Sequence, residues 1–156
     1  MRDGVEPMFQ KIIQLPFNQE LAAGTLPEGK FLFYLQQDHN YLTHFSRALA
    51  MVGAKMEDSG DFLQFLQFAQ TAVKAQKVLH GKFFAKFGFK DGDASAIVAS
   101  PTAFAYTQFQ LATVATKSLP EALAALLPCF WIYREMACKL ECVFWDSAYR
   151  METWPV

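Results

Sequence analysis

The apolar residues of this chain recur every three or four positions, a spacing that places them on one face of an α-helix. In the stretch that follows Pro27 this apolar face consists of Leu32, Leu35, Tyr41, Leu42, Phe45, Ala48 and Val52. We find no convincing run that alternates apolar and polar residues between turn signals, as a β-strand would. The pattern therefore predicts an all-α fold, and the length of 156 residues fits a single domain covering residues 1–156.

Capping residues, prolines and glycines divide this pattern into successive helices. A capping box, in which Ser or Thr precedes Glu by three residues, is predicted at Thr25–Glu28 and again at Ser118–Glu121. Ser59 and Ser100 are further predicted helix caps, and Gly24 is a predicted helix end. The predicted helices cover residues 6–15, 17–23, 27–56, 60–87, 94–99, 101–117 and 120–152.

The charge pattern argues against nucleic acid and membrane partners. The net charge is −1, and the Lys and Arg residues are scattered rather than gathered into a stripe that would follow phosphates. The longest apolar stretch, residues 119–132, is interrupted by Pro120, Glu121 and Pro128 and is shorter than the roughly 20 residues that span a membrane. The first residues form no signal peptide. We therefore expect neither a membrane span nor secretion.

The cysteines indicate a reducing compartment. Their number, three, is odd, and Cys129, Cys138 and Cys142 have no metal-ligand spacing such as C-x-x-C. This favours reduced thiols in a cytoplasmic protein over a disulfide framework, and it predicts neither a metal nor another cofactor.

The apolar content suggests an assembly of several copies. Apolar residues make up 53% of the sequence, and 16 of them are Phe, which is more than a monomer of this length comfortably buries. We therefore expect a homo-oligomer that hides part of this surface.

Asp38 is an acidic residue in an aromatic stretch. It lies three residues before Tyr41, so the two side chains are neighbours on one helix face. If that face is buried, the carboxylate must be hydrogen-bonded or protonated, because an unpaired buried charge is very costly. Alternatively, Asp38 lies on a solvated side beside Gln36 and Gln37, and the two interpretations have similar weight.

Cys129 is the first residue after a proline within an apolar helix. It shares a face with Tyr133, four residues later, whereas Trp131 points elsewhere. Taken alone, such a cysteine is more often a buried core residue than a nucleophile. Both interpretations stay open on this evidence.

Glu141 is a second acid in an apolar and aromatic setting. With Phe144, Trp145 and Ala148 it forms a stripe at helical spacing. Because Lys139 is close by in the sequence, an ordinary solvated position on the outer face of the helix fits Glu141 as well.

Three stretches of the sequence carry a recognisable signature: LQQDHNYLTHF at Leu35–Phe45, SPTAFAYT at Ser100–Thr107 and LLPCFWIY at Leu126–Tyr133. They closely resemble the TenA/THI-4 family of thiaminase II, and ECVFWDSAYR at Glu141–Arg150 is similar to the family's last helix. The resemblance implies an all-α, haem-oxygenase-like helical bundle, usually a homotetramer. It also implies hydrolysis of aminopyrimidines and, in many members, of thiamin, in thiamin salvage.

The same resemblance assigns roles to individual residues. Cys129 matches the nucleophile of the cysteine-bearing class, and Glu141 matches the acid/base. Asp38 matches the carboxylate that holds the amidine-like edge of the pyrimidine. Tyr41, Tyr106 and Phe144 match the aromatic walls of the family's pocket, and Tyr133 matches a hydroxyl beside the cysteine. This set suits an aminopyrimidine aminohydrolase, because a thiolate can add to an electron-poor ring while an acid protonates a ring nitrogen.

The chain departs from the family between Leu140 and Glu141, where about 60 residues are lacking. If residues 120–152 form one unbroken helix, Cys129 and Glu141 lie about 18 Å apart along its axis and point about 120° from each other. The pair then cannot share a substrate. Three explanations fit this difference: a real deletion, a longer protein whose segment is left out of the sequence, and an engineered or mispredicted product. We favour the omitted segment, because the site is otherwise intact.

Two other functions remain as alternatives. A non-catalytic pyrimidine-binding or helical interaction protein would keep Asp38 and the aromatic residues without a usable Cys129–Glu141 pair. A haem-oxygenase-like metal enzyme is disfavoured, because His39, His44 and His80 do not form a recognisable ligand set with acidic residues on neighbouring turns.

Overall fold

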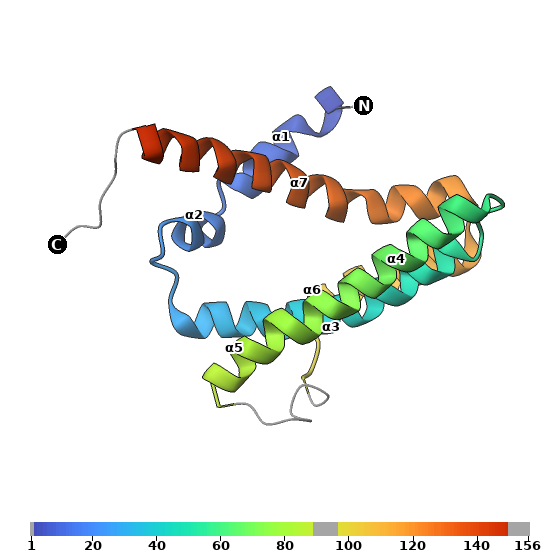
Figure 1. Cartoon of the computed structure of the whole chain (residues 1–156), viewed down its shortest axis with the longest axis horizontal. Coiled ribbons are helices and arrows are strands. Elements are labelled where there is room, and N and C mark those ends of the chain that lie inside the picture. Colours follow the sequence, from blue (N-terminus) through green and yellow to red (C-terminus); the bar gives the residue numbers. More distant parts are fainter. Residues whose placement is uncertain (1, 89–96, 150–156) are drawn as a thin grey trace. The chain divides into compact units, whose positions relative to one another are not determined.

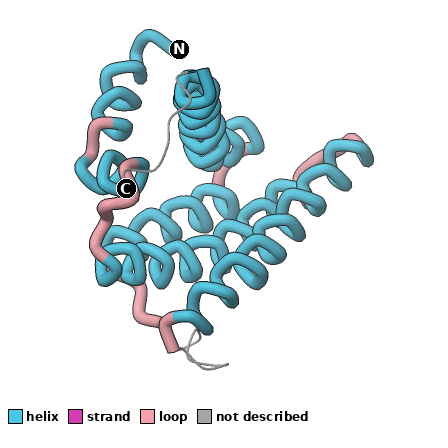
Figure 2. Tube along the Cα trace, turned by 60° about the vertical axis from the view of Figure 1, so that its left-hand side comes forward, coloured by secondary structure: helices cyan, strands magenta, loops and turns pink. Residues whose placement is uncertain are grey.

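A computed structural model describes residues 2–88 and 97–149, with side chains for residues 6–78, 81–83, 85–88 and 97–135. Within these ranges the chain consists of helices and loops and contains no strand (Figure 2). The elements are α1 (Arg2–Ile13), α2 (Pro16–Ala22), α3 (Glu28–Gly53), α4 (Ser59–Ala75), the π-helix η1 (Gln76–His80), α5 (Gly81–Lys86), α6 (Pro101–Thr116) and α7 (Leu119–Tyr149). The predicted all-α class is confirmed.

The chain divides into two compact units. The central unit comprises Leu26–Leu126, and the terminal unit comprises Met1–Thr25 together with Leu127–Val156. Helix α7 begins in the central unit and continues in the terminal unit.

Helix α3 is the centre of the central unit and packs against both α4 and α6 (Figure 1). Helix α6 runs parallel to α3. Gln37 in the first half of α3 bonds to Ser100 just before α6, and Lys55 just after α3 bonds to the carbonyl of Lys117 just after α6. The apolar core of this unit consists of Leu35, Phe45, Ala48, Leu49, Val52, Ala69, Val114, Ala122, Ala125 and Leu126. The helical stripe predicted for α3 therefore marks much of the buried face.

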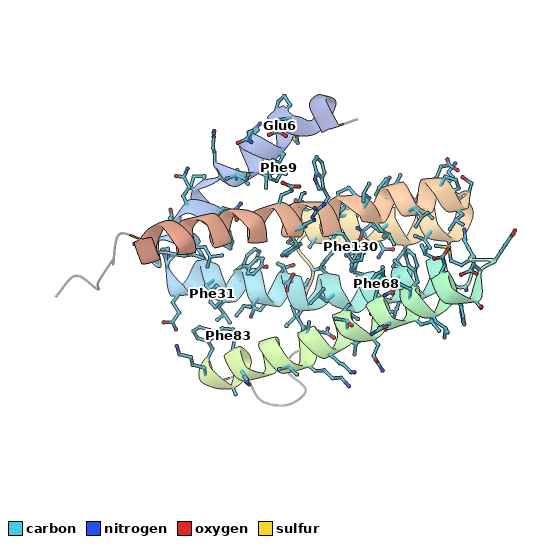
Figure 3. The ribbon with its side chains drawn as sticks, turned by 45° about the horizontal axis from the view of Figure 1, so that its top comes forward. Glu6, Phe9, Phe31, Phe68, Phe83 and Phe130 are labelled. Atoms are coloured by element: carbon cyan, nitrogen blue, oxygen red, sulfur yellow. The ribbon has the colours of Figure 1, made fainter. Side chains whose placement is uncertain are left out.

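Helices α4, η1 and α5 follow one another without a break and run antiparallel to α3. At one end of this pair Phe31 of α3 and Phe83 of α5 point toward one another, edge to face, with ring centroids 5.3 Å apart (Figure 3). At the other end the helices cross at Gly53, where an added Cβ would lie 3.1 Å from the Cβ of Phe65. The missing side chain of Gly53 thus lets the two backbones approach.

We predict opposite effects of the same substitution at two glycines of α3. Gly53→Ala is expected to lower the free energy of unfolding by about 1 kcal/mol, because overpacking outweighs the gain in helix propensity. Gly29→Ala, where nothing lies within 4 Å of an added Cβ, is expected to raise it by a few tenths of a kcal/mol. Urea denaturation of both variants checks this, and stabilisation by both would contradict the close approach at Gly53.

The end of α2 explains why one predicted capping box does not form. Gly24 adopts a φ of 69°, in the left-handed region that favours glycine. The N–H groups of Gly24 and Thr25 donate to the carbonyls of Leu21 and Glu20, at 3.2 and 2.9 Å, which is a Schellman motif. Thr25 is thereby engaged with α2, and Pro27 is the N-cap of α3, without a side-chain cap. The predicted Thr25–Glu28 box is therefore wrong, and the predicted helix end at Gly24 is confirmed.

The other predicted caps differ in outcome. Ser100 caps α6 as predicted, accepting from the N–H of Ala103 at 3.3 Å. In the predicted Ser118–Glu121 capping box, the bond from the Ser118 backbone N–H to the Glu121 carboxylate is present, at 3.0 Å. The hydroxyl of Ser118 donates to the same carboxylate, at 2.6 Å. These two bonds lower the pKa of the exposed Glu121 carboxyl below its ordinary value.

Several predicted helix starts need correction. Asp58 rather than Ser59 caps α4, because its carboxylate accepts from the N–H of Asp61 at 2.9 Å. Helix α1 begins at Arg2 rather than at residue 6, so that Pro7 lies inside it. Residues 97–99 are not helical, and the rest of the predicted 94–99 helix lies outside the described residues.

In the terminal unit, α1 and α7 are joined by an aromatic contact. Phe9 is buried, and its ring stacks on Trp131 with centroids 5.8 Å apart. One turn before Phe9, Glu6 accepts a hydrogen bond from Gln10 at 2.6 Å (Figure 3). Trp131 is thus used in packing against α1.

Among the helices that the structure describes, none has the length and apolar character that a membrane crossing requires.

Candidate functional site

Asp38 and Tyr41 lie one turn apart on α3, in the central unit. Both side chains are half-buried, so Asp38 occupies neither a fully buried nor a fully solvated position. The interpretation of Asp38 as a purely solvated residue therefore does not fit. A carboxylate in such a position is reachable by a ligand while part of its water shell has been removed, which strengthens its hydrogen bonds.

The second element of the site is Tyr106 on α6, whose ring lies against the ring of Tyr41. The centroids are 5.5 Å apart and the ring planes differ by only 1°. Tyr41 also stacks on buried Phe45, at 5.1 Å and 20°. Tyr106 is 38% exposed, so the stack reaches from the core to the surface. The structure thus brings three of the predicted site residues, Asp38, Tyr41 and Tyr106, onto one pair of helices.

Polar atoms without a protein partner accumulate in the same helix pair, and sequence reasoning did not single them out. Gln110, one turn after Tyr106, is 1% exposed, and neither its amide nitrogen nor its amide oxygen has a hydrogen-bond partner in the described part of the chain. The same holds for Asn40 Oδ1 and His44 Nδ1 on α3. The only sequence signal was the position of Gln110 at helical spacing between Thr107 and Val114, the other two buried residues of α6. Buried amides normally have hydrogen-bond partners, so a glutamine on such a face stands out.

Cys129 and Tyr133 lie in the terminal unit, one turn apart on α7. Cys129 is half-buried, which fits a reachable thiol better than a core residue. Tyr133 is 56% exposed. Pro128 directly before Cys129 lies inside the helix and has no N–H to donate to the preceding turn.

Glu141 and Phe144 also lie on α7, but their side chains are outside the described part of the structure. The backbone of α7 is helical from Leu119 to Tyr149 without interruption. Twelve residues therefore separate Cys129 from Glu141 within one helix, which corresponds to about 18 Å along the axis. The folded chain does not bring these two positions together.

In the part of the chain with described side chains, no three His, Cys, Asp or Glu residues cluster closely enough to bind a metal ion. The candidate residues of the central unit are thus a carboxylate and aromatic rings, and the terminal unit contributes a thiol on α7.

Comparison with protein families gives one match across most of the chain. Residues 2–141 match the family described as TENA/THI-4/PQQC. A protein of Bacillus subtilis named aminopyrimidine aminohydrolase is 36% identical over 125 residues, covering 80% of this chain and 53% of that protein. One of the same name from Halalkalibacterium halodurans is 29% identical, with 87% and 61% covered.

Two solved structures extend the comparison to the fold. A TenA homologue from P. horikoshii has a TM-score of 0.79 at 36% identity, covering 87% of this chain and 63% of that one. A TenA family transcription regulator from Silicibacter has a TM-score of 0.83 at 33% identity, with 90% and 63% covered. The chain thus has the all-α, haem-oxygenase-like fold of these homologues, and it spans only about half to two-thirds of the length of each relative.

Proposed function

Because the chain belongs to the TENA/THI-4/PQQC family, we propose that it is a thiamin-salvage hydrolase acting on an aminopyrimidine such as 4-amino-5-aminomethyl-2-methylpyrimidine. The names of the relatives support this at the level of the family. The observation that carries the proposal is the Tyr41–Tyr106 stack beside Asp38. Flat aromatic rings bind a flat heterocycle, and a carboxylate one turn away can hold its polar edge.

In the proposed complex, Asp38 accepts hydrogen bonds from the amino group and a protonated ring nitrogen of the pyrimidine. Tyr41, Tyr106 and Phe144 are the proposed aromatic walls of the pocket, and Tyr133 supplies a hydroxyl beside Cys129. Support for these roles comes from the residues' match to the family stretches and, for the first three, from their places on neighbouring helices.

The proposed chemistry assigns Cys129 as nucleophile. Its thiolate forms a C–S bond with the pyrimidine ring while an acid protonates a ring nitrogen. The bond between the exocyclic methylene and its amine then breaks, and the amine leaves with the electron pair and takes up a proton. Water adds to the methylene and gives up a proton. The C–S bond then breaks with the electron pair going to the sulfur, and the ring nitrogen returns its proton to the acid. The net reaction converts the aminomethyl group and water into a hydroxymethyl group and ammonia.

Glu141 is the proposed acid/base, and its position on α7 favours a second candidate function. An acid about 18 Å along the helix from the thiol cannot protonate a ring bound at Cys129. A chain that keeps Asp38 and the stacked tyrosines but lacks the acid would bind a pyrimidine without hydrolysing it. A non-catalytic pyrimidine-binding protein is therefore the alternative.

One experiment separates the two functions. The chain is titrated calorimetrically with 4-amino-5-hydroxymethyl-2-methylpyrimidine, the product of the proposed reaction, and ammonia release from the aminomethyl compound is measured on the same preparation. Binding with ammonia release supports the hydrolase, and binding without release supports the alternative. Absence of binding would contradict both.

We further propose that the chain forms a single domain and assembles into a homo-oligomer, which the family resemblance suggests is a tetramer. A cytoplasmic location stays a prediction. Phe104 and Phe109 of α6 support an oligomer, because they are 57% and 58% exposed. Sedimentation is expected to give a multiple of 17.7 kDa, and Phe109→Ser is expected to shift the distribution toward smaller species. A monomer at all concentrations would contradict the oligomer.

A further inference from the structure

Gln37, the neighbour of Asp38 on α3, joins this helix to the segment that starts α6. Its Oε1 accepts a hydrogen bond from the backbone N–H of Ser100 at 2.8 Å, and its Nε2 donates to the carbonyl of Val98 at 3.3 Å. The two partners lie 63 and 61 positions further along the chain. Because Ser100 is also the N-cap of α6, Gln37 determines where that helix begins beside α3.

The position of Tyr106 depends on that starting point. Tyr106 follows Ser100 by six residues and stacks on Tyr41, which follows Gln37 by four. A shift of α6 by one residue would move the ring of Tyr106 by about 1.5 Å along the axis and turn it by about 100°. The nearly parallel stack of the two tyrosines does not survive such a shift.

On another side of α3, Gln76 forms hydrogen bonds with the turn that follows Asp38. Gln76 is buried, and its Nε2 donates to the carbonyl of His39 at 2.8 Å and to the hydroxyl of Thr43 at 2.5 Å. The hydroxyl of Thr43 in turn donates to the carbonyl of His39 at 3.0 Å. Because α3 is fixed on this side, losing the bonds of Gln37 displaces the start of α6 rather than the turn that carries Asp38.

We infer that Gln37 is a positioning residue of the aminopyrimidine site, which sets the ring of Tyr106 against Tyr41 and Asp38. The inference rests on the proposed function, because it concerns binding at that same site. Gln37 acts through Tyr106 and has no contact with the ligand itself.

Two substitutions test the bonds of Gln37. Gln37→Met has nearly the same shape and loses both hydrogen bonds, and we expect it to raise the dissociation constant for 4-amino-5-hydroxymethyl-2-methylpyrimidine about tenfold. Gln37→Glu keeps an acceptor for the N–H of Ser100, and we expect its affinity to stay within about threefold of the wild type. The control is Gln36→Met on the same helix, at a half-buried glutamine for which no hydrogen bond occurs among the described residues.

A double-mutant cycle with Tyr106→Leu distinguishes positioning from general stabilisation. If Gln37 acts through Tyr106, then Gln37→Met has little further effect on affinity once Tyr106 has been replaced. A purely structural role would lower the melting temperature of Gln37→Met and leave the affinity of the folded protein unchanged. Calorimetry is therefore done well below the melting temperature of every variant.

The outcomes are separable. A wild type that does not bind the pyrimidine overturns the proposed function and the inference with it. If the wild type binds, equal affinities of Gln37→Met and Gln36→Met overturn the inference alone, as do additive losses in the cycle. The inference predicts that Gln37→Met weakens pyrimidine binding and that Gln37→Glu keeps nearly the wild-type affinity. It also predicts that the affinity losses of Gln37→Met and Tyr106→Leu are not additive.

Discussion

Replacing Cys129 with alanine is expected to lower the rate of aminopyrimidine hydrolysis by about 10³-fold or more. The proposed reaction passes through a C–S bond to this residue, and alanine offers no atom that can form it. The residue is half-buried, so the change should leave the fold and pyrimidine binding largely intact. Ammonia release measures the rate, and calorimetry on the same sample shows that the variant still binds.

The matched control is Cys138→Ala, the same substitution later in α7. It is expected to keep the wild-type rate, so that the loss is specific to one thiol. Equal rates for the wild type and Cys129→Ala would remove Cys129 from the mechanism, whatever the other measurements give.

The second large effect is expected at Asp38. Asp38→Asn keeps the shape of the side chain but loses the charge that strengthens its hydrogen bonds to the pyrimidine. A hydrogen bond to a charged group contributes about 1.5–3 kcal/mol, so the dissociation constant should rise about 100-fold. Calorimetric titration with the hydroxymethyl pyrimidine measures this change.

Asp61→Asn on α4 is the control for Asp38→Asn. Asp61 is exposed in the first turn of its helix and plays no part in the proposed site. Its substitution should leave the affinity unchanged. If both variants bind as tightly as the wild type, the pyrimidine is not held by Asp38.

The helical periodicity predicted the fold class because each long helix must bury an apolar stripe. Several helix boundaries could not be predicted in the same way, because neighbouring residues compete to cap. Asp58 and Ser59 are both good caps, and the fold uses Asp58. Thr25 fits a capping box in sequence, yet its backbone N–H is used to end α2. These choices depend on loop geometry, which local sequence does not determine.

The candidate site was only partly predictable. The positions of Asp38 and Tyr41 on one helix face follow from their spacing, but Tyr106 could be placed beside them only by family resemblance. The hydrogen bonds of Gln37 and Gln76 reach more than 30 positions along the chain and leave no local signal. The sequence did predict one constraint correctly: in an unbroken helix Cys129 and Glu141 are far apart, and α7 is unbroken between them.

The proposed hydrolysis of the aminomethyl bond of an aminopyrimidine is tested most directly by product analysis in ¹⁸O-labelled water. The full chain is incubated with 4-amino-5-aminomethyl-2-methylpyrimidine, and the products are identified by mass spectrometry. We expect one ammonia for each hydroxymethyl pyrimidine formed, with the heavy oxygen on the exocyclic methylene. Bound substrate that is recovered unchanged, with no ammonia above the protein-free blank, would contradict it.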